Sequence, residues 1–171
     1  MTAAAVAAAV AAATGAADLA GGRRHPSPGT GVGGGPWQPA AVPELTLADV
    51  GLAVRAAWCL QTCDDVDVAD WSPVNPARGQ CGATALMVHD LLGGELLVAE
   101  VRHPDGSRQG HHYWNRLPGG VEVDLTREQF APDEVLQEPR VVEPPPGLPH
   151  RCAAQYLRLR ASVCAALGVR G

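Results

Sequence analysis

Three residues in the second half of the chain have the types and the order of a cysteine-dependent catalytic triad. Cys81 stands at the expected start of a helix, and His112 and Asp124 stand in two expected strands. The free N–H groups at a helix N-terminus favour the thiolate, which is the nucleophilic form of cysteine. A histidine oriented by a carboxylate can accept the thiol proton. Together the three residues predict attack of a thiol on a carbonyl carbon.

The choice between the adjacent histidines, His111 and His112, depends on the turn that follows them. The sequence LPGGV fits a three-residue hairpin loop with Pro118 at the second position of a type I turn. That register sets Trp114 opposite Asp124, so that both share a face of the hairpin with His112. A slip of one residue would select His111 instead. The turn therefore predicts His112 as the general base.

Substrate carbonyls also need hydrogen-bond donors in such a site. The backbone N–H of Cys81 is the natural first donor to an oxyanion, and the side chain of Gln80 or Asn75 could supply a second. Trp114 is expected to form a pocket wall that positions the substrate. The sequence does not decide between the two amides.

Each member of the triad also has a plain structural explanation. Cys81 could be a small buried residue at a helix start, since free cysteine is among the most buried residue types. His112 could be a hydrogen-bonded core histidine, and Asp124 a residue at a strand end. Only their joint arrangement favours catalysis.

The other cysteines do not predict a metal site. Cys59 and Cys63 share a helical face and could join Cys81 and a histidine, but structural zinc sites use close cysteine pairs on turns. No glycine-rich segment follows a strand and opens a helix, as a phosphate loop does. We therefore expect no metal and no cofactor. The odd count of 5 cysteines, without a signal peptide, favours reduced thiols and a cytoplasmic protein.

Charge and composition exclude other classes of partner. The net charge is −5, and the 13 basic residues are scattered arginines, so a nucleic-acid surface is not expected. The alanine-rich run near the N-terminus is too weakly apolar to predict a membrane span. The expected partner is an amide, ester or protein substrate, and the oligomeric state stays open.

The chain divides into an extension and one domain. Residues 1–43 are rich in alanine, glycine and proline and are expected to be disordered, because such a segment buries too little apolar surface to offset its ordering entropy. Residues 44–171 predict a single α+β domain that ends in a helix.

The elements of this domain follow from capping, turn and periodicity signals. A capping box is expected at Thr46 and Asp49, and Gly93 is expected to end the helix that Cys81 begins. A proline-rich connection follows the last expected strand. The expected helices begin near residue 46 and span 81–92 and 150–168, and the expected strands span 95–103, 111–117 and 121–126.

A resemblance to a known family is carried by two stretches. The sequences NPARGQCGATALMVHDLLGG and HHYWNRLPGGVEVDLTREQF, with the spacing between them, are similar to the YunG-like family of uncharacterised bacterial proteins. The likeness covers roughly residues 71–130, and AWCLQT adds a weaker likeness upstream. It implies a grouping and not a reaction.

A more distant likeness implies a reaction. A cysteine that opens a helix, a His-x-Trp strand and an Asp-x-Thr strand resemble the transglutaminase and papain-like superfamily. The resemblance implies helices packed on a small antiparallel sheet, with Cys81 as nucleophile, His112 as base and Asp124 as orienting group. The implied reaction is acyl transfer or amide hydrolysis, as in a peptidase, deamidase or transglutaminase. A non-catalytic binding module with the same fold is the alternative.

Overall fold

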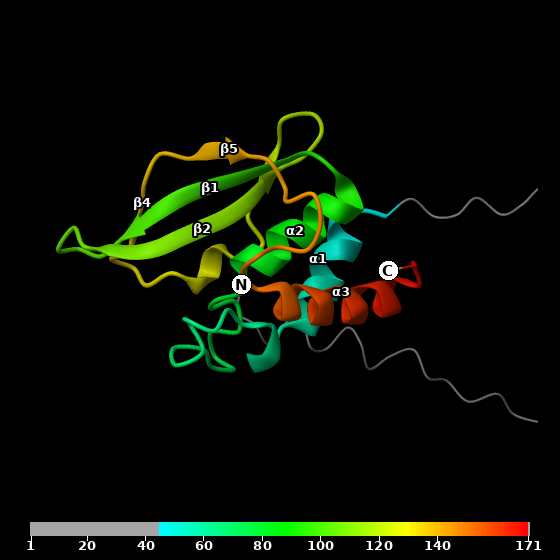
Figure 1. The fold of residues 1–171 in the computed structure, drawn as a ribbon, viewed down its shortest axis with the longest axis horizontal. Coiled ribbons are helices and arrows are strands. Elements are labelled where there is room, and N and C mark those ends of the chain that lie inside the picture. The colour runs from blue at the N-terminus through cyan, green and yellow to red at the C-terminus, as the bar shows by residue number, and fades with distance from the viewer. Residues whose placement is uncertain (1–44, 171) are drawn as a thin grey trace, which may run out of the picture. The chain divides into compact units, whose positions relative to one another are not determined.

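Three α-helices and a small antiparallel sheet form the part of the protein that the computed structural model describes, residues 45–170 (Figure 1). This arrangement confirms the predicted α+β class. The predicted disordered extension, residues 1–43, and its alanine-rich run lie outside the described residues. Within residues 45–170, no helix has both the length and the apolar character needed to cross a membrane.

The first helix begins at the predicted capping box. In α1 (Leu47–Ala57), the backbone N–H of Asp49 donates to the Thr46 hydroxyl at 3.2 Å, and the backbone N–H of Thr46 donates to the Asp49 carboxylate at 3.0 Å. Two donors that a helix start leaves free are thereby paired. The short 3₁₀ helix η3 (Leu60–Thr62) follows.

The second helix has the predicted bounds. Helix α2 runs over Cys81–Leu92 and ends at Gly93, whose φ of 71° is readily adopted by glycine. The long loop between η3 and α2 is polar, as expected. The closing helix α3 (Ala153–Leu167) begins three residues after the predicted start.

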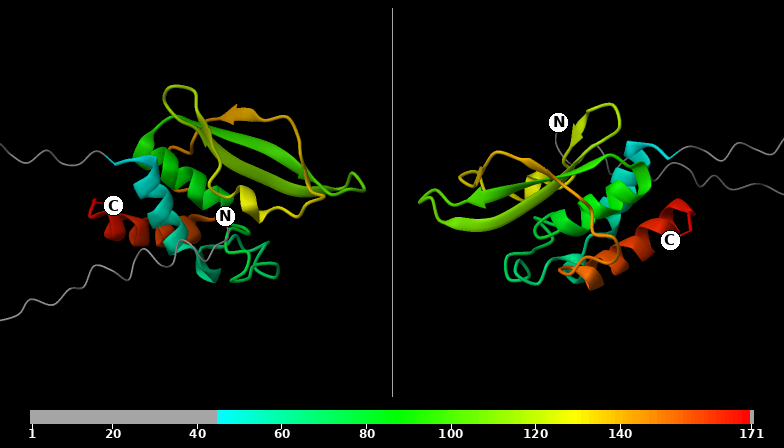
Figure 2. Two further views of the ribbon diagram at one scale, coloured as in Figure 1. Left: turned by 180° about the vertical axis from the view of Figure 1, so that it is seen from behind. Right: turned by 45° about the horizontal axis from the view of Figure 1, so that its top comes forward.

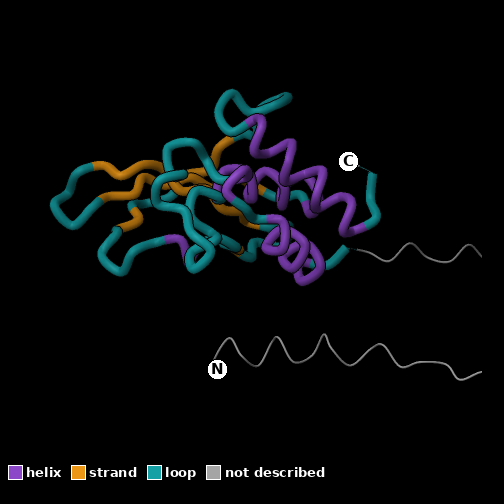
Figure 3. Tube along the Cα trace, turned by 90° about the horizontal axis from the view of Figure 1, so that it is seen from below, coloured by secondary structure: helices purple, strands orange, loops and turns teal. Residues whose placement is uncertain are grey.

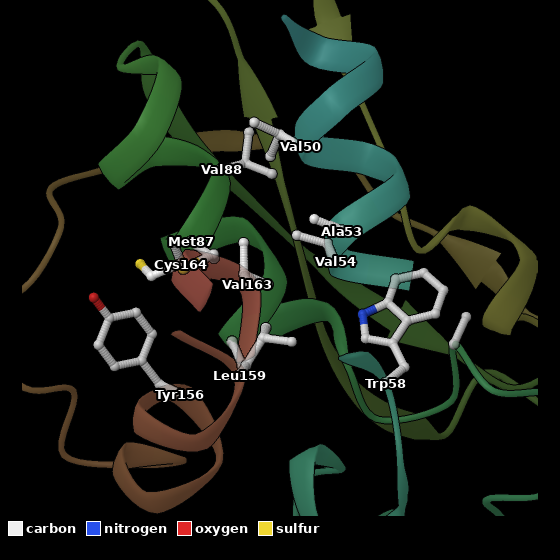
Figure 4. Packing of buried hydrophobic residues seen from close by; sticks show 12 residues of the cluster. Val50, Ala53, Val54, Trp58, Met87, Val88, Tyr156, Leu159, Val163 and Cys164 are labelled. Atoms are coloured by element: carbon white, nitrogen blue, oxygen red, sulfur yellow. The ribbon is translucent and has the colours of Figure 1, made fainter. Parts of the chain in front are cut away.

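The three helices pack on one another around an apolar core (Figure 4). Figure 3 shows them gathered together, with the strands extending beyond them. The cluster draws apolar side chains from all three helices, among them Val50, Val54, Met87, Val88, Leu159 and Val163. Helix α2, which carries Cys81, is therefore held against α1 and α3 by close packing.

The sheet places α2 beside a long hairpin. Strands β1 (Glu95–Arg102) and β2 (Arg108–Arg116) pair antiparallel, and β3 (Glu122–Val123) joins β2. On the other edge, β1 pairs with β4 (Val135–Leu136) and β5 (Arg140–Val142), as Figure 2 helps to follow. The segment that was expected to be a proline-rich connection therefore contains an edge strand, β5. It forms because the free edge of β1 at Leu96–Val98 can pair with its backbone.

The hairpin turn keeps the predicted register but not the predicted turn type. The N–H of Leu117 donates to the carbonyl of Val121 at 2.9 Å, and Asn115 pairs with Val123. Gly119, which follows Pro118 at the third position of the turn, has a φ of 95°, which is the value of a type II turn and not of type I. Glycine permits this φ, and the faces of the strands are unchanged.

The helical core predicts that two leucines of α3 contribute very differently to the free energy of unfolding. Leu159 is fully buried and Leu157 is 43% exposed. We expect Leu159→Ala to lower the free energy of unfolding by about 2–5 kcal/mol through lost burial and a cavity, and Leu157→Ala to change it by less than about 1 kcal/mol. Urea unfolding measures both variants, and equal losses would contradict the packing.

Candidate active site

Cys81 is the first residue of α2 and lies beside the middle of β2. Its sulfur donates to the main-chain oxygen of His111 at 3.9 Å, and its side chain is half-buried. At this position the thiol faces the free N–H groups of the helix start. The fold therefore brings Cys81 to the strand that carries both histidines.

His112 and Asp124 form a direct hydrogen bond. The Nε2–H of His112 donates to Oδ2 of Asp124 at 2.8 Å, and the His112 side chain is only 1% exposed. The second carboxylate oxygen accepts from the backbone N–H of Thr126 at 3.0 Å and from its hydroxyl at 3.2 Å. Both oxygens of Asp124 are thus paired, which fixes the carboxylate toward the ring.

Two aromatic side chains enclose the imidazole. Trp114 stacks on His112 with ring centroids 5.5 Å apart, and Phe130 meets the ring edge-on at 4.7 Å. The indole N–H of Trp114 donates to Glu122 at 3.2 Å. Trp114 therefore walls and orients His112, while its expected contact with a substrate stays a prediction.

The surroundings of His111 and His112 shift the pKa values of the two side chains in opposite directions. Burial lowers the pKa of His112, but hydrogen bonds to Asp124 and to Cys81 outweigh burial and raise that pKa to about 9. On the other face of β2, burial and the nearby Arg108 guanidinium lower the pKa of His111. The Cys81 thiol thus raises the pKa of His112, which is the histidine that the turn predicted as the general base.

Gln129 is a member of the site that the sequence reasoning missed. Its amide nitrogen lies 2.6 Å from Nδ1 of His112, and the residue is 6% exposed. The short helix η4 (Arg127–Gln129) folds the chain back onto the ring after Asp124. Nε2 of His112 is bonded to Asp124, so a thiol proton could be accepted only by Nδ1. In this structure the Gln129 amide already contacts Nδ1.

The two amides expected near an oxyanion support the surrounding loops in this geometry. Gln80 is fully buried, and its amide nitrogen donates to the main-chain oxygen of Cys59 at 3.0 Å. The amide nitrogen of Asn75 donates to the main-chain oxygen of Gln129 at 3.2 Å. Each amide nitrogen thus uses one of its two N–H groups on a main-chain oxygen, and a role in binding an oxyanion remains a prediction.

A cavity of about 680 Å³ borders Cys81. It lies on the face of β2 that carries His111 and Tyr113, whereas His112 and Trp114 lie on the opposite face. The nucleophile candidate therefore has open space on one side and the candidate base on the other. Among the described residues, no three His, Cys, Asp or Glu side chains are grouped to hold a metal ion.

Comparison with known proteins decides the grouping. The family model described as "YunG protein" matches residues 46–168. The chain belongs to the YunG family. The "Uncharacterized protein YunG" of Bacillus subtilis (strain 168) is 37% identical over 70 residues, which cover 40% of this chain and 55% of that protein.

These matches support a family and leave its chemistry open. The chain spans about half the length of the curated relative it matches, and the printed name of that YunG protein assigns no activity. No solved structure matches the chain. The YunG resemblance is confirmed, but the distant likeness to transglutaminases and papain-like enzymes has no support from these comparisons.

The His112 environment predicts an unusual titration. In NMR spectra of the imidazole protons, we expect one of the 6 histidines to titrate near pH 9, and His112→Gln to remove that signal. Asp124→Asn should lower this pKa, because the imidazolium loses its carboxylate while its burial remains. Titration of every histidine at or below its ordinary pKa would contradict the site geometry.

The same group makes folding stability depend on pH. Because the folded pKa of His112 exceeds its ordinary value of 6.5, the stabilisation is complete below that value and disappears as the pH rises toward about 9. We expect a loss of about 2–3 kcal/mol between about pH 6.5 and pH 8.5. Burial raises the pKa of the thiols of Cys63 to about 12 and of Cys152 to about 11, so their effect begins only above that window.

Chemical unfolding across this range measures the effect. The His112→Gln variant is the control, since it removes the titrating group and should lose stability less steeply over the window. Parallel curves for the two proteins would show that His112 is not the cause.

Proposed function

We propose that this YunG protein is a cysteine-dependent acyl hydrolase or acyltransferase. Cys81 would be the nucleophile, His112 the base and Asp124 the orienting carboxylate. The observation that carries the proposal is the buried 2.8 Å bond from His112 to Asp124, on a ring whose pKa is also raised by the Cys81 thiol. An imidazole held this way can take and return a proton at a fixed place.

The reaction would proceed in two steps that share one base nitrogen. Nδ1 of His112 takes the Cys81 proton, the thiolate forms a bond to the carbonyl carbon of an ester, thioester or amide, and the leaving group departs with the proton from Nδ1. Water or an amine then attacks the thioester, and the thiol is regenerated. Asp124 stabilises the imidazolium throughout.

Two further groups would take part in these steps, the backbone N–H of Cys81 and the side-chain amide of Gln129. The N–H of Cys81, at the first position of α2, is outside the internal hydrogen bonds of the helix and suits a developing oxyanion. The amide of Gln129 occupies Nδ1 at rest and would turn aside when the thiol proton moves. Hydrogen bonds between catalytic groups are often long or poorly aligned before substrate binds and tighten in the complex.

The distant likeness to transglutaminases and papain-like enzymes supports the same chemistry. It rests on the order of the motifs, and the cysteine at the start of α2 beside an antiparallel sheet agrees with it. A non-catalytic module is the second candidate, and one observation favours it. Gln129 already bonds the nitrogen that the thiol would need.

Alkylation without any substrate separates the two candidates. We expect iodoacetamide at about pH 7 to modify Cys81 at least roughly tenfold faster than Cys59 and Cys152, which are similarly half-buried. The His112→Gln variant should remove this advantage, and His111→Gln should keep it. Peptide mass spectrometry follows each thiol, and slow, uniform labelling of the native protein would refute the catalytic proposal.

A further inference from the structure

The cavity beside Cys81 has apolar walls from four separate elements. Helix α2 contributes Ala85 and Leu86, β1 contributes Leu96, β2 contributes Tyr113 and β5 contributes Val142. The pairing of Leu96 with Val142 puts both side chains on the face that carries Tyr113. These residues give the cavity a surface suited to an apolar group.

The two arginines that border the cavity already have carboxylate partners, and His150, which also borders it, is exposed to solvent. The Arg151 guanidinium bonds Asp64 at 2.8 Å, and Nε of Arg108 lies 3.4 Å from a carboxylate oxygen of Glu100. Burial and the nearby Arg108 guanidinium lower the pKa of His111, which favours its uncharged form. An anionic ligand would have to compete with Asp64 and Glu100 for these guanidinium groups, so the arginines offer it no unpaired positive charge.

The acidic side chains of the lining are used in a similar way. Asp64 is bonded to Arg151, and Asp67 lies 3.0 Å from the guanidinium of Arg78. Glu143 borders the cavity but is exposed to solvent, where its charge is screened. A cationic ligand would therefore gain little from entering.

The nucleophile candidate has direct access to this space. Cys81 and Gly82 both line the cavity at the start of α2. A Cβ atom at position 82 would lie 3.5 Å from the sulfur of Cys152, an ordinary van der Waals contact, so the start of α2 lies close to Cys152, which also lines the cavity. A carbonyl group bonded to the Cys81 sulfur would lead its substituent into the cavity.

We propose that this cavity binds the acyl part of the substrate, and that this part is an uncharged, apolar group the size of a medium aliphatic chain or an aromatic ring. A volume of about 680 Å³ lies within the range of sites for small organic ligands. The proposal rests on the proposed function for the identity of the nucleophile. The acyl group enters as part of an ester or amide, becomes a thioester on Cys81, and leaves as a carboxylic acid after water attacks.

Two valines of β5 form a matched pair for the test. Val142 lines the cavity, and Val141, on the other face of the same strand, is 46% exposed. Val142→Trp places a large ring in the cavity, and Val141→Trp adds the same ring on the other face. Thermal unfolding of both variants checks that each is folded.

Turnover of three 4-nitrophenyl esters measures acyl preference in the full chain. We expect kcat/KM for the hexanoate to exceed that for the acetate by at least roughly tenfold, since each buried methylene adds to transition-state binding. The succinate half-ester, which carries a charge, should be no better than the acetate. Val142→Trp should reduce hexanoate turnover at least tenfold with little effect on acetate, and Val141→Trp should change neither.

A second measurement does not need turnover. Hexanamide, an uncharged and unreactive probe, should slow the alkylation of Cys81 by iodoacetamide in the native protein and in Val141→Trp, but not in Val142→Trp. Acetamide and succinamate should give no protection at the same concentration. Protection without ester turnover would refute the catalytic proposal and retain the apolar site.

Two results would overturn the inference. Equal turnover of hexanoate and acetate, or equal losses for both esters in Val142→Trp, would show that the acyl group lies elsewhere. Failure of hexanamide to protect Cys81 would show that the cavity does not hold an apolar group beside the thiol.

Discussion

The hydrogen bond between His112 and Asp124 constrains the chain around it more than any other contact of the site. An imidazole that is 1% exposed must have polar partners at both nitrogens, because an unpaired buried nitrogen costs free energy. Asp124 serves Nε2, and Gln129 serves Nδ1. The chain therefore leaves β3 after only two residues and turns through η4 to bring both groups back to the ring.

A second constraint ties α2 to the same hairpin. A Cβ atom at Gly94 would lie 2.3 Å from the main-chain oxygen of Arg116, so only glycine permits this approach of the α2–β1 connection to the end of β2. In the first half of the helix, Ala85 accepts a hydrogen bond at its main-chain oxygen from the Asn115 amide at 2.9 Å. Both contacts fix how α2 lies along β2. Since α2 also packs into the helical core, that core holds Cys81 beside the strand of His112.

The sequence was sufficient where one short segment determines the structure. The capping box of α1, the bounds of α2 and the register of the hairpin depend on neighbouring residues, and all three were predicted. The turn type was wrong because two glycines in succession allow more than one turn with the same register. Strand β5 was missed because its pairing with β1 joins distant segments, and Gln129 was missed because only the folded η4 aims its side chain at Nδ1. The cavity was not predictable either, since it needs the relative positions of four elements.

Alternation of side chains along β2 separates two requirements of the proposed chemistry. His112 and Trp114 point to a sealed face where a proton can be held, and His111 and Tyr113 point to the face with the cavity. Cys81 lies beside the strand and meets both faces, because its sulfur approaches the main chain of His111 while its thiol influences His112. A substitution in the cavity wall can therefore change which acyl group fits without touching a partner of the imidazole. The adjacent histidines, which look interchangeable in the sequence, belong to two different environments for this reason.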